Sequence, residues 1–140
     1  MLRVLQSKVG VVSCSGEELA EGTVSRLATL KVLHELRPGA TVTICLPLFL
    51  AGGEGDREFA RHHPTITVDG CALRCAARGT ELHSGKPAAS VVVNDLLDAA
   101  GQPRPSGRRC LDGAGRQAVE RVAEHVAKLV DELAAKGPAR

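Results

Sequence analysis

Short runs of β-branched residues alternate with helix-length segments along this chain, and the alternation limits the folds open to it. Each run is short enough to be a strand buried on both faces. Strands that alternate with helices form a parallel sheet, because every crossover returns the chain in the same direction. We therefore predict an α/β fold, a three-layer sandwich with a four-stranded, mostly parallel, Rossmann-like sheet. The predicted strands cover residues 8–13, 41–45, 65–68 and 89–93.

Helix-forming residues fill the segments between these runs. Pro38-Gly39 ends the first predicted helix and Pro64 ends the second, which we expect Asp56 to cap. A chain of 140 residues suits one domain. We expect a single domain over residues 1–136 and a disordered tail at 137–140. The predicted helices cover residues 17–37, 56–63, 72–83 and 115–136.

Composition and charge exclude several classes of partner. The chain has two Phe and no Trp or Tyr, so it offers little for stacking on bases, and its net charge is only +2. We therefore expect no nucleic-acid partner. Nothing reaches the roughly 18 consecutive apolar residues of a membrane helix, and residues 1–8 lack a signal-peptide pattern. We expect a cytoplasmic protein without a membrane partner.

Five cysteines stand out in a chain assigned to that compartment. Cytoplasmic thiols stay reduced, so these residues indicate metal or redox chemistry rather than a disulfide framework. Cys14 follows the first predicted strand, Cys45 ends the second, and Cys71 and Cys75 follow the third. The carboxyl ends of parallel strands meet at one edge of a sheet, where ligands bind. The four side chains are therefore predicted to meet there.

The spacing and setting of these cysteines favour a shared ion. If Cys71 and Cys75 lie on one helix, their Cβ atoms are about 5–6 Å apart, whereas a disulfide requires about 3.5–4.5 Å. A metal with zinc–sulfur bonds of about 2.3 Å removes that conflict. We expect Cys14 and Cys71 to begin helices, where thiolate is favoured. Arg74 and Arg78 could offset the negative charge, and Gly16 and Gly70 would allow close backbone approach.

Other residues have a plain structural interpretation beside a functional one. Any one of the four cysteines alone would be read as a small buried apolar residue. Cys110, after an arginine-rich loop, is interpreted as a free cysteine rather than a fifth ligand. Asp69 either caps the following helix or serves the site as a carboxylate. We expect His62-His63 to be solvated near the opposite edge of the sheet.

The same residues resemble the DGC-domain family of zinc-binding proteins. The resemblance rests on Cys14-Ser15-Gly16, on Cys45, and on Asp69-Gly70-Cys71 followed by Cys75, and it covers residues 8–95. It implies zinc held by these four cysteines. It names a ligand set and no reaction, and it carries nothing over to Cys110.

Three functions remain open from the sequence. The first is a protein with zinc bound by Cys14, Cys45, Cys71 and Cys75, since a closed shell of four sulfurs is typical of structural zinc. The second is an iron–sulfur cluster on the same four ligands. The third is a thiol enzyme for redox or sulfur-transfer chemistry, in which Cys14 attacks and Cys71 or Cys75 resolves the intermediate.

Overall fold

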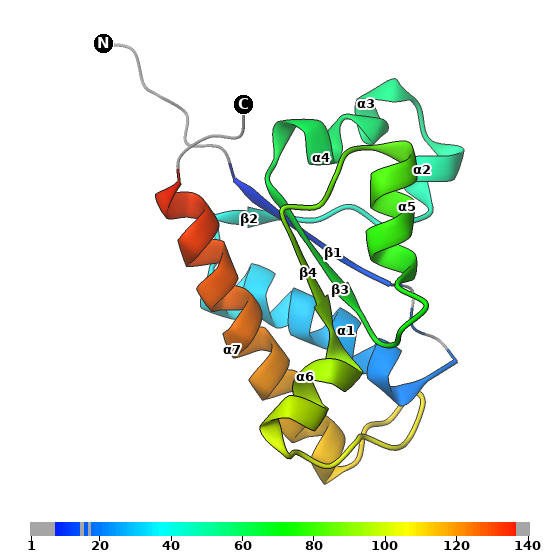
Figure 1. Cartoon of the computed structure of the whole chain (residues 1–140), viewed down its shortest axis with the longest axis vertical. Coiled ribbons are helices and arrows are strands. Elements are labelled where there is room, and N and C mark those ends of the chain that lie inside the picture. The colour runs from blue at the N-terminus through cyan, green and yellow to red at the C-terminus, as the bar shows by residue number, and fades with distance from the viewer. Residues whose placement is uncertain (1–7, 15, 17, 137–140) are drawn as a thin grey trace.

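The computed structural model describes residues 8–14, 16 and 18–136, and its strands form one parallel sheet between two layers of helices (Figure 1). The strand order is β2-β1-β3-β4. The three-layer α/β prediction is therefore confirmed, and the sheet is parallel throughout the described residues. The strands are β1 (Val9–Ser13), β2 (Thr41–Val42), β3 (Thr65–Asp69) and β4 (Ala89–Val92).

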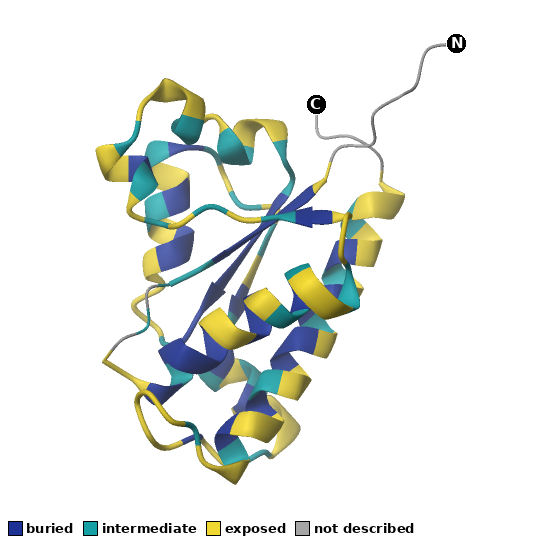
Figure 2. Cartoon of the chain, turned by 180° about the vertical axis from the view of Figure 1, so that it is seen from behind, coloured by how far each residue is buried: buried dark blue, intermediate teal, exposed yellow. Residues whose placement is uncertain are grey.

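The larger helical layer covers one face of the sheet and contains the main hydrophobic core. The buried residues of its helices lie on the sides that face the sheet (Figure 2). Ile66 and Val68 of β3 pack there with Val122 and Val126, all fully buried. The described residues of this core cluster are Val, Leu, Ile and Ala. The layer consists of α1 (Ala20–Lys31), its π-helical extension η1 (Val32–Leu36), α6 (Val93–Ala100) and α7 (Gly113–Ala135).

The second helical layer consists of short helices, which are held by local contacts outside the main hydrophobic core. Gly10 of β1 leaves room for the Phe59 ring, because a Cβ there would lie 2.6 Å from Phe59 Cε1. The Ser84 hydroxyl accepts from the Ala60 N–H at 2.9 Å and donates to the Arg57 carbonyl at 2.5 Å. The layer consists of α2 (Leu48–Ala51), α3 (Glu54–Arg57), α4 (Phe59–His62) and α5 (Cys75–His83).

Several predicted boundaries are wrong for local reasons. The strand predicted over 41–45 ends at Val42, because the chain then turns and the Leu48 N–H donates to the Cys45 carbonyl at 3.0 Å. The helix predicted over 56–63 is divided into α3 and α4. Asp56 is not the N-cap of that segment but lies inside α3, where its carboxylate accepts from the Gly53 N–H at 3.0 Å.

Two helices of the structure, α2 and α6, have no counterpart in the sequence prediction. Helix α2 was not predicted, and α6 begins at Val93, which was assigned to the fourth strand. The tail predicted at residues 137–140 lies outside the described residues. Across the described part of the chain, no helix has both the length and the apolar character needed to span a membrane.

Candidate functional site

The sheet has a topological switch point between β1 and β3. The chain leaves β1 through α1 to reach β2 on one side, then crosses to β3 on the other side. The two crossovers lie on opposite faces of the sheet (Figure 1), so a crevice is expected beyond the carboxyl ends of β1 and β3. Ligands of open α/β sheets bind at such a crevice. Cys14 directly follows β1. Asp69 is the last residue of β3, and Gly70 and Cys71 follow it.

Three glycines bring the backbones around this crevice into direct contact. A Cβ on Gly22 of α1 would lie 2.3 Å from the Gly16 Cα, and a Cβ on Gly70 would lie 2.6 Å from the Gly22 nitrogen. Gly16 also has a φ of +67°, which side chains disfavour. The loop after β1, the first turn of α1 and the loop after β3 are therefore held together by positions where a side chain does not fit. Gly16 and Gly70 were expected to let the backbone approach a metal site; in the structure both approach the backbone of α1 at Gly22.

Three of the predicted cysteines line one pocket at the switch point. Cys14, Cys71 and Cys75 border a pocket of about 360 Å³, together with Asp69 and Gly70. Leu19 and Leu73 also line it and are 45% and 67% exposed. The pocket thus combines thiols with an apolar rim.

Cys45 lies on the other side of Cys14. These two cysteines line a neighbouring hollow of about 350 Å³ that also includes Arg26 and Thr43. Cys14 therefore borders both spaces, while Cys45 and Cys75 have exposed side chains. Within the residues that the structure describes, no three His, Cys, Asp or Glu side chains lie close enough together to hold a metal ion.

Cys14 is partly buried, and the net effect of its surroundings is to raise the pKa of its thiol. Burial raises its pKa, hydrogen bonds with Ser25 and the Gly70 backbone lower it, and the nearby charges of Asp69 and Cys75 raise it further. The Ser25 hydroxyl lies 3.2 Å from the Cys14 Sγ and donates its proton to the Gly22 carbonyl at 2.6 Å. Ser25 thus links the Cys14 thiol to the first turn of α1.

The expected helical spacing of Cys71 and Cys75 is wrong. Helix α5 begins at Cys75, and Cys71 belongs to the preceding turn, where its carbonyl accepts from the Arg74 N–H at 3.1 Å. Arg74 has a φ of 54°, a left-handed conformation that ends the turn. The predicted helix-start positions of Cys14 and Cys71 are also wrong, because α1 begins at Ala20. Of the four cysteines, Cys75 is the one at a helix start.

Asp69 explains why α5 begins where it does. Its carboxylate accepts from the N–H groups of Ala76 and Ala77 at 2.7 and 3.1 Å, so it caps the first turn of α5 from the end of β3. Burial raises its pKa, and the two N–H groups oppose that effect. The structure thus favours the capping interpretation of Asp69 over the alternative.

The remaining candidates lie apart from the pocket or on its margin. Arg74 lines the pocket, and Arg78 is exposed on α5. Cys110 is exposed in the loop before α7 and lines neither hollow. His62 pairs with Glu58 at 2.9 Å, and His63 Nδ1 lies 3.0 Å from the Lys8 carbonyl beside the start of β1. The prediction that the two histidines lie near the opposite edge is confirmed.

Gly22 and Ser25 are residues of this site that were not predicted. Both lie in α1, one turn apart: Gly22 contacts the loops after β1 and β3, and Ser25 contacts Cys14. A signal was present for Gly22, because a lone glycine inside a helical pattern often has a packing reason. Ser25 gave no such signal, since a serine near a helix start usually serves the helix itself.

Comparison with known families identifies the chain. The DGC domain matches residues 10–126, which include all five cysteines and the whole switch point. The chain belongs to the DGC domain family. The match extends beyond the predicted limit at residue 95, so α6 and much of α7 are part of the DGC domain. Neither the curated proteins nor the solved structures include a significant match to the chain.

Proposed function

We propose that this DGC domain binds one zinc ion through the thiolates of Cys14, Cys45, Cys71 and Cys75. The main support is the pocket at the switch point, which three of these cysteines line and which shares Cys14 with the hollow beside Cys45. Soft thiolate ligands suit zinc, and four of them complete its coordination. Zinc bound in this way supplies stability to the fold rather than a vacant position for a substrate.

The donor chemistry fits this ion, although the side chains are not gathered around a common point. Cys45 and Cys75 are exposed, so their side chains are free to turn toward Cys14. Because Cys45 precedes α2 and Cys75 begins α5, zinc binding would fasten the second helical layer to the edge of the sheet. Metal binding and folding are coupled in such sites.

The electrostatics of Cys14 argue against the alternative of a thiol enzyme. A nucleophilic cysteine requires a thiolate near neutral pH, whereas burial raises the pKa of Cys14. A zinc ion reverses this preference, since a coordinating thiol is deprotonated outright. The pocket is thus better suited to holding a cation than to activating a nucleophile.

Metal analysis of protein purified in reducing buffer tests the proposal. We expect one zinc ion per chain in the wild type, and loss of zinc in the Cys71→Ser variant, with a lower midpoint of thermal unfolding. Cys110→Ser is the matched control, because Cys110 lines neither hollow, and it should keep its zinc. A folded, monodisperse and metal-free wild type would contradict the proposal.

Two further readouts separate the alternatives. A brown colour with visible absorption after anaerobic purification would indicate an iron–sulfur cluster instead of zinc. The Cys45→Ser variant tests the fourth ligand. If it kept zinc as tightly as the wild type does, then Cys45 would not be a ligand and the proposed closed shell would be wrong.

A further inference from the structure

The two outer edges of the sheet differ in how well they are protected. At one edge β2 is two residues long, which leaves little backbone free for pairing. At the other edge β4 has four residues, Ala-Ser-Val-Val, with no charge and no proline. Proteins usually blunt an exposed edge with lysine, proline or a bulge. The β4 edge lacks those devices.

The backbone groups that β4 leaves free can be assigned from its pairing with β3. The Ala88 N–H donates to the Thr65 carbonyl at 2.8 Å, and the Asn94 N–H donates to the Gly70 carbonyl at 3.4 Å. Hydrogen-bonding direction alternates along a strand, so the even-numbered residues between them also face β3. The N–H and C=O groups of Ala89 and Val91 therefore point away from the sheet.

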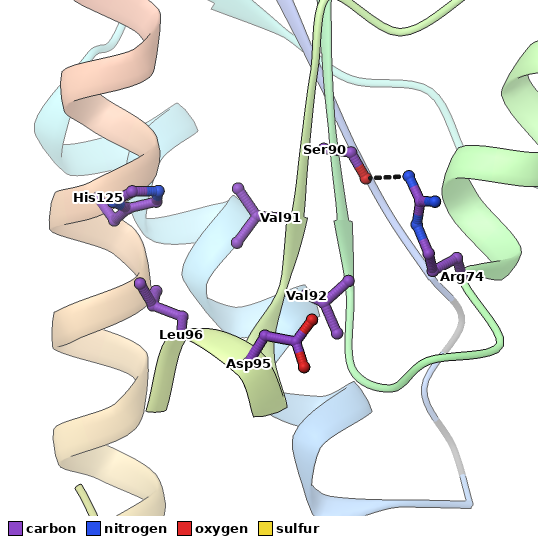
Figure 3. Close-up of a pocket in the computed structure, with 7 residues that line it drawn as sticks. All are labelled: Arg74, Ser90, Val91, Val92, Asp95, Leu96 and His125. Atoms are coloured by element: carbon purple, nitrogen blue, oxygen red, sulfur yellow. Dashed lines mark hydrogen bonds between the residues drawn. The ribbon is translucent and has the colours of Figure 1, made fainter. Parts of the chain in front are cut away.

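A groove of about 460 Å³ runs along this free edge (Figure 3). Ser90, Val91 and Val92 line it together with Arg74 and Asp95. Arg74 Nη2 donates to Ser90 Oγ at 2.9 Å. Among the described residues neither Arg74 nor Asp95 forms an ion pair, so the groove presents one unpaired charge of each sign.

We propose that two copies of this chain associate through their β4 edges, in antiparallel pairing about a two-fold axis at Val91. Directly opposite residues of an antiparallel pair share a face of the sheet. With Val91 opposite Val91 of the partner subunit, the outward groups of both strands face each other. Ala89 then lies opposite Val93 of the partner subunit. Val93 begins α6, where the first N–H groups have no acceptor within the helix.

The charges of Arg74 and Asp95 favour an axis at Val91 over an axis one residue away, at Ser90. Centring the axis on Val91 places Ser90 opposite Val92 of the partner subunit. Arg74, which is bonded to Ser90, then approaches the partner's Asp95, and the same contact recurs by symmetry. Centring the axis on Ser90 would instead bring the two Arg74 side chains together. The groove is thus self-complementary in the way that a two-fold interface requires.

Sedimentation equilibrium with the full chain in reducing buffer tests this association, since the reductant prevents disulfide-linked dimers. We expect the wild type to dimerise as its concentration rises. Arg74→Glu and Asp95→Arg should each weaken dimerisation by about tenfold or more. The double variant should recover it, because the charges are exchanged and the pair is restored. Circular dichroism of each variant checks that it is folded.

A second pair of variants covers the case in which the double exchange does not fold. Ser90→Lys adds a cation beside Arg74 at the interface and should abolish the dimer, whereas Ser90→Thr keeps the hydroxyl and should retain it. A wild type that stays monomeric throughout, including one whose β4 edge binds some other strand, would overturn the proposal. A dimer insensitive to both single exchanges, or one not recovered in a folded double variant, would overturn it as well.

Discussion

A single carboxylate, that of Asp69, connects β3 to α5 and so positions Cys75. The side chain is 1% exposed, and both of its oxygens accept N–H groups from the first turn of α5. Buried N–H groups left without partners destabilise a fold by more than a formed hydrogen bond stabilises it. Asp69 is therefore a structural residue whose position determines where a proposed ligand lies.

Replacing Asp69 with alanine should lower the free energy of unfolding by roughly 1–3 kcal/mol, because two N–H groups lose their acceptor. Urea denaturation followed by circular dichroism measures this change. Asp98→Ala is the control: Asp98 pairs with Arg104 where both side chains are more than half exposed, so the expected change is within about 0.5 kcal/mol. Equal effects of the two substitutions would show that the cap contributes nothing.

At this scale the cysteines show what the sequence can and cannot reveal. Their place at one edge of the sheet follows from parallel topology, because Cys14 and Cys71 directly follow β1 and β3. The details depend on contacts between distant residues. The late start of α5 depends on Asp69, and the protonation of Cys14 depends on its burial beside Ser25. Neither the start of α5 nor the protonation of Cys14 can be predicted from the spacing of residues along the sequence.

Among the elements, α1 is shaped by the loops that it contacts. Its Gly22 is an unfavourable residue for a helix interior, yet Gly16 and Gly70 approach it so closely that a side chain does not fit. The preference of the helix and the packing of the switch point thus oppose each other at this residue. A substitution to alanine shows which of the two dominates.

Gly22→Ala should destabilise the domain by roughly 1–3 kcal/mol, because backbone atoms 2.3 Å from the new Cβ must move. Gly113→Ala, also in a helix, is the matched control. Its Cβ would meet nothing nearer than Arg116 Nη2 at 3.9 Å, so helix propensity should stabilise the domain by up to about 1 kcal/mol. Thermal unfolding of both variants measures the difference. A stabilising Gly22→Ala would contradict the proposed packing role.

The sequence predicts the limits of some elements better than those of others. Strands β1 and β3 and helix α7 each have a sustained pattern, and their predicted limits differ from the structure by at most two residues. Helix α6 continues the apolar run of β4 without a capping side chain at Val92, so nothing local separates strand from helix. Its separate existence depends on Leu97, which is fully buried in the main core.

At the scale of the whole molecule, the core between the sheet and α1, α6 and α7 should dominate stability. Leu97→Ala should lower the free energy of unfolding by about 2–5 kcal/mol, because it leaves a cavity at a position with 0% exposure. Leu82→Ala is the matched control. Leu82 is 78% exposed on α5, so its removal should change stability by no more than about 0.5 kcal/mol. Urea denaturation compares the two variants, and similar losses would contradict this assignment of the core.

The two helical layers differ in how much apolar surface they bury, and this difference affects local opening of the fold. The layer of α2 to α5 buries Phe49, Ala76 and Ala77 but, among the described residues, contributes none to the main hydrophobic core, and regions with few buried apolar contacts open first under native conditions. Its amides should exchange with deuterated solvent ahead of those in α1 and α7. Cys45 and Cys75 belong to this looser half, whereas Cys14 and Cys71 belong to the sheet margin. A metal ion bound by all four cysteines would link the second helical layer to the edge of the sheet and so restrict this local opening.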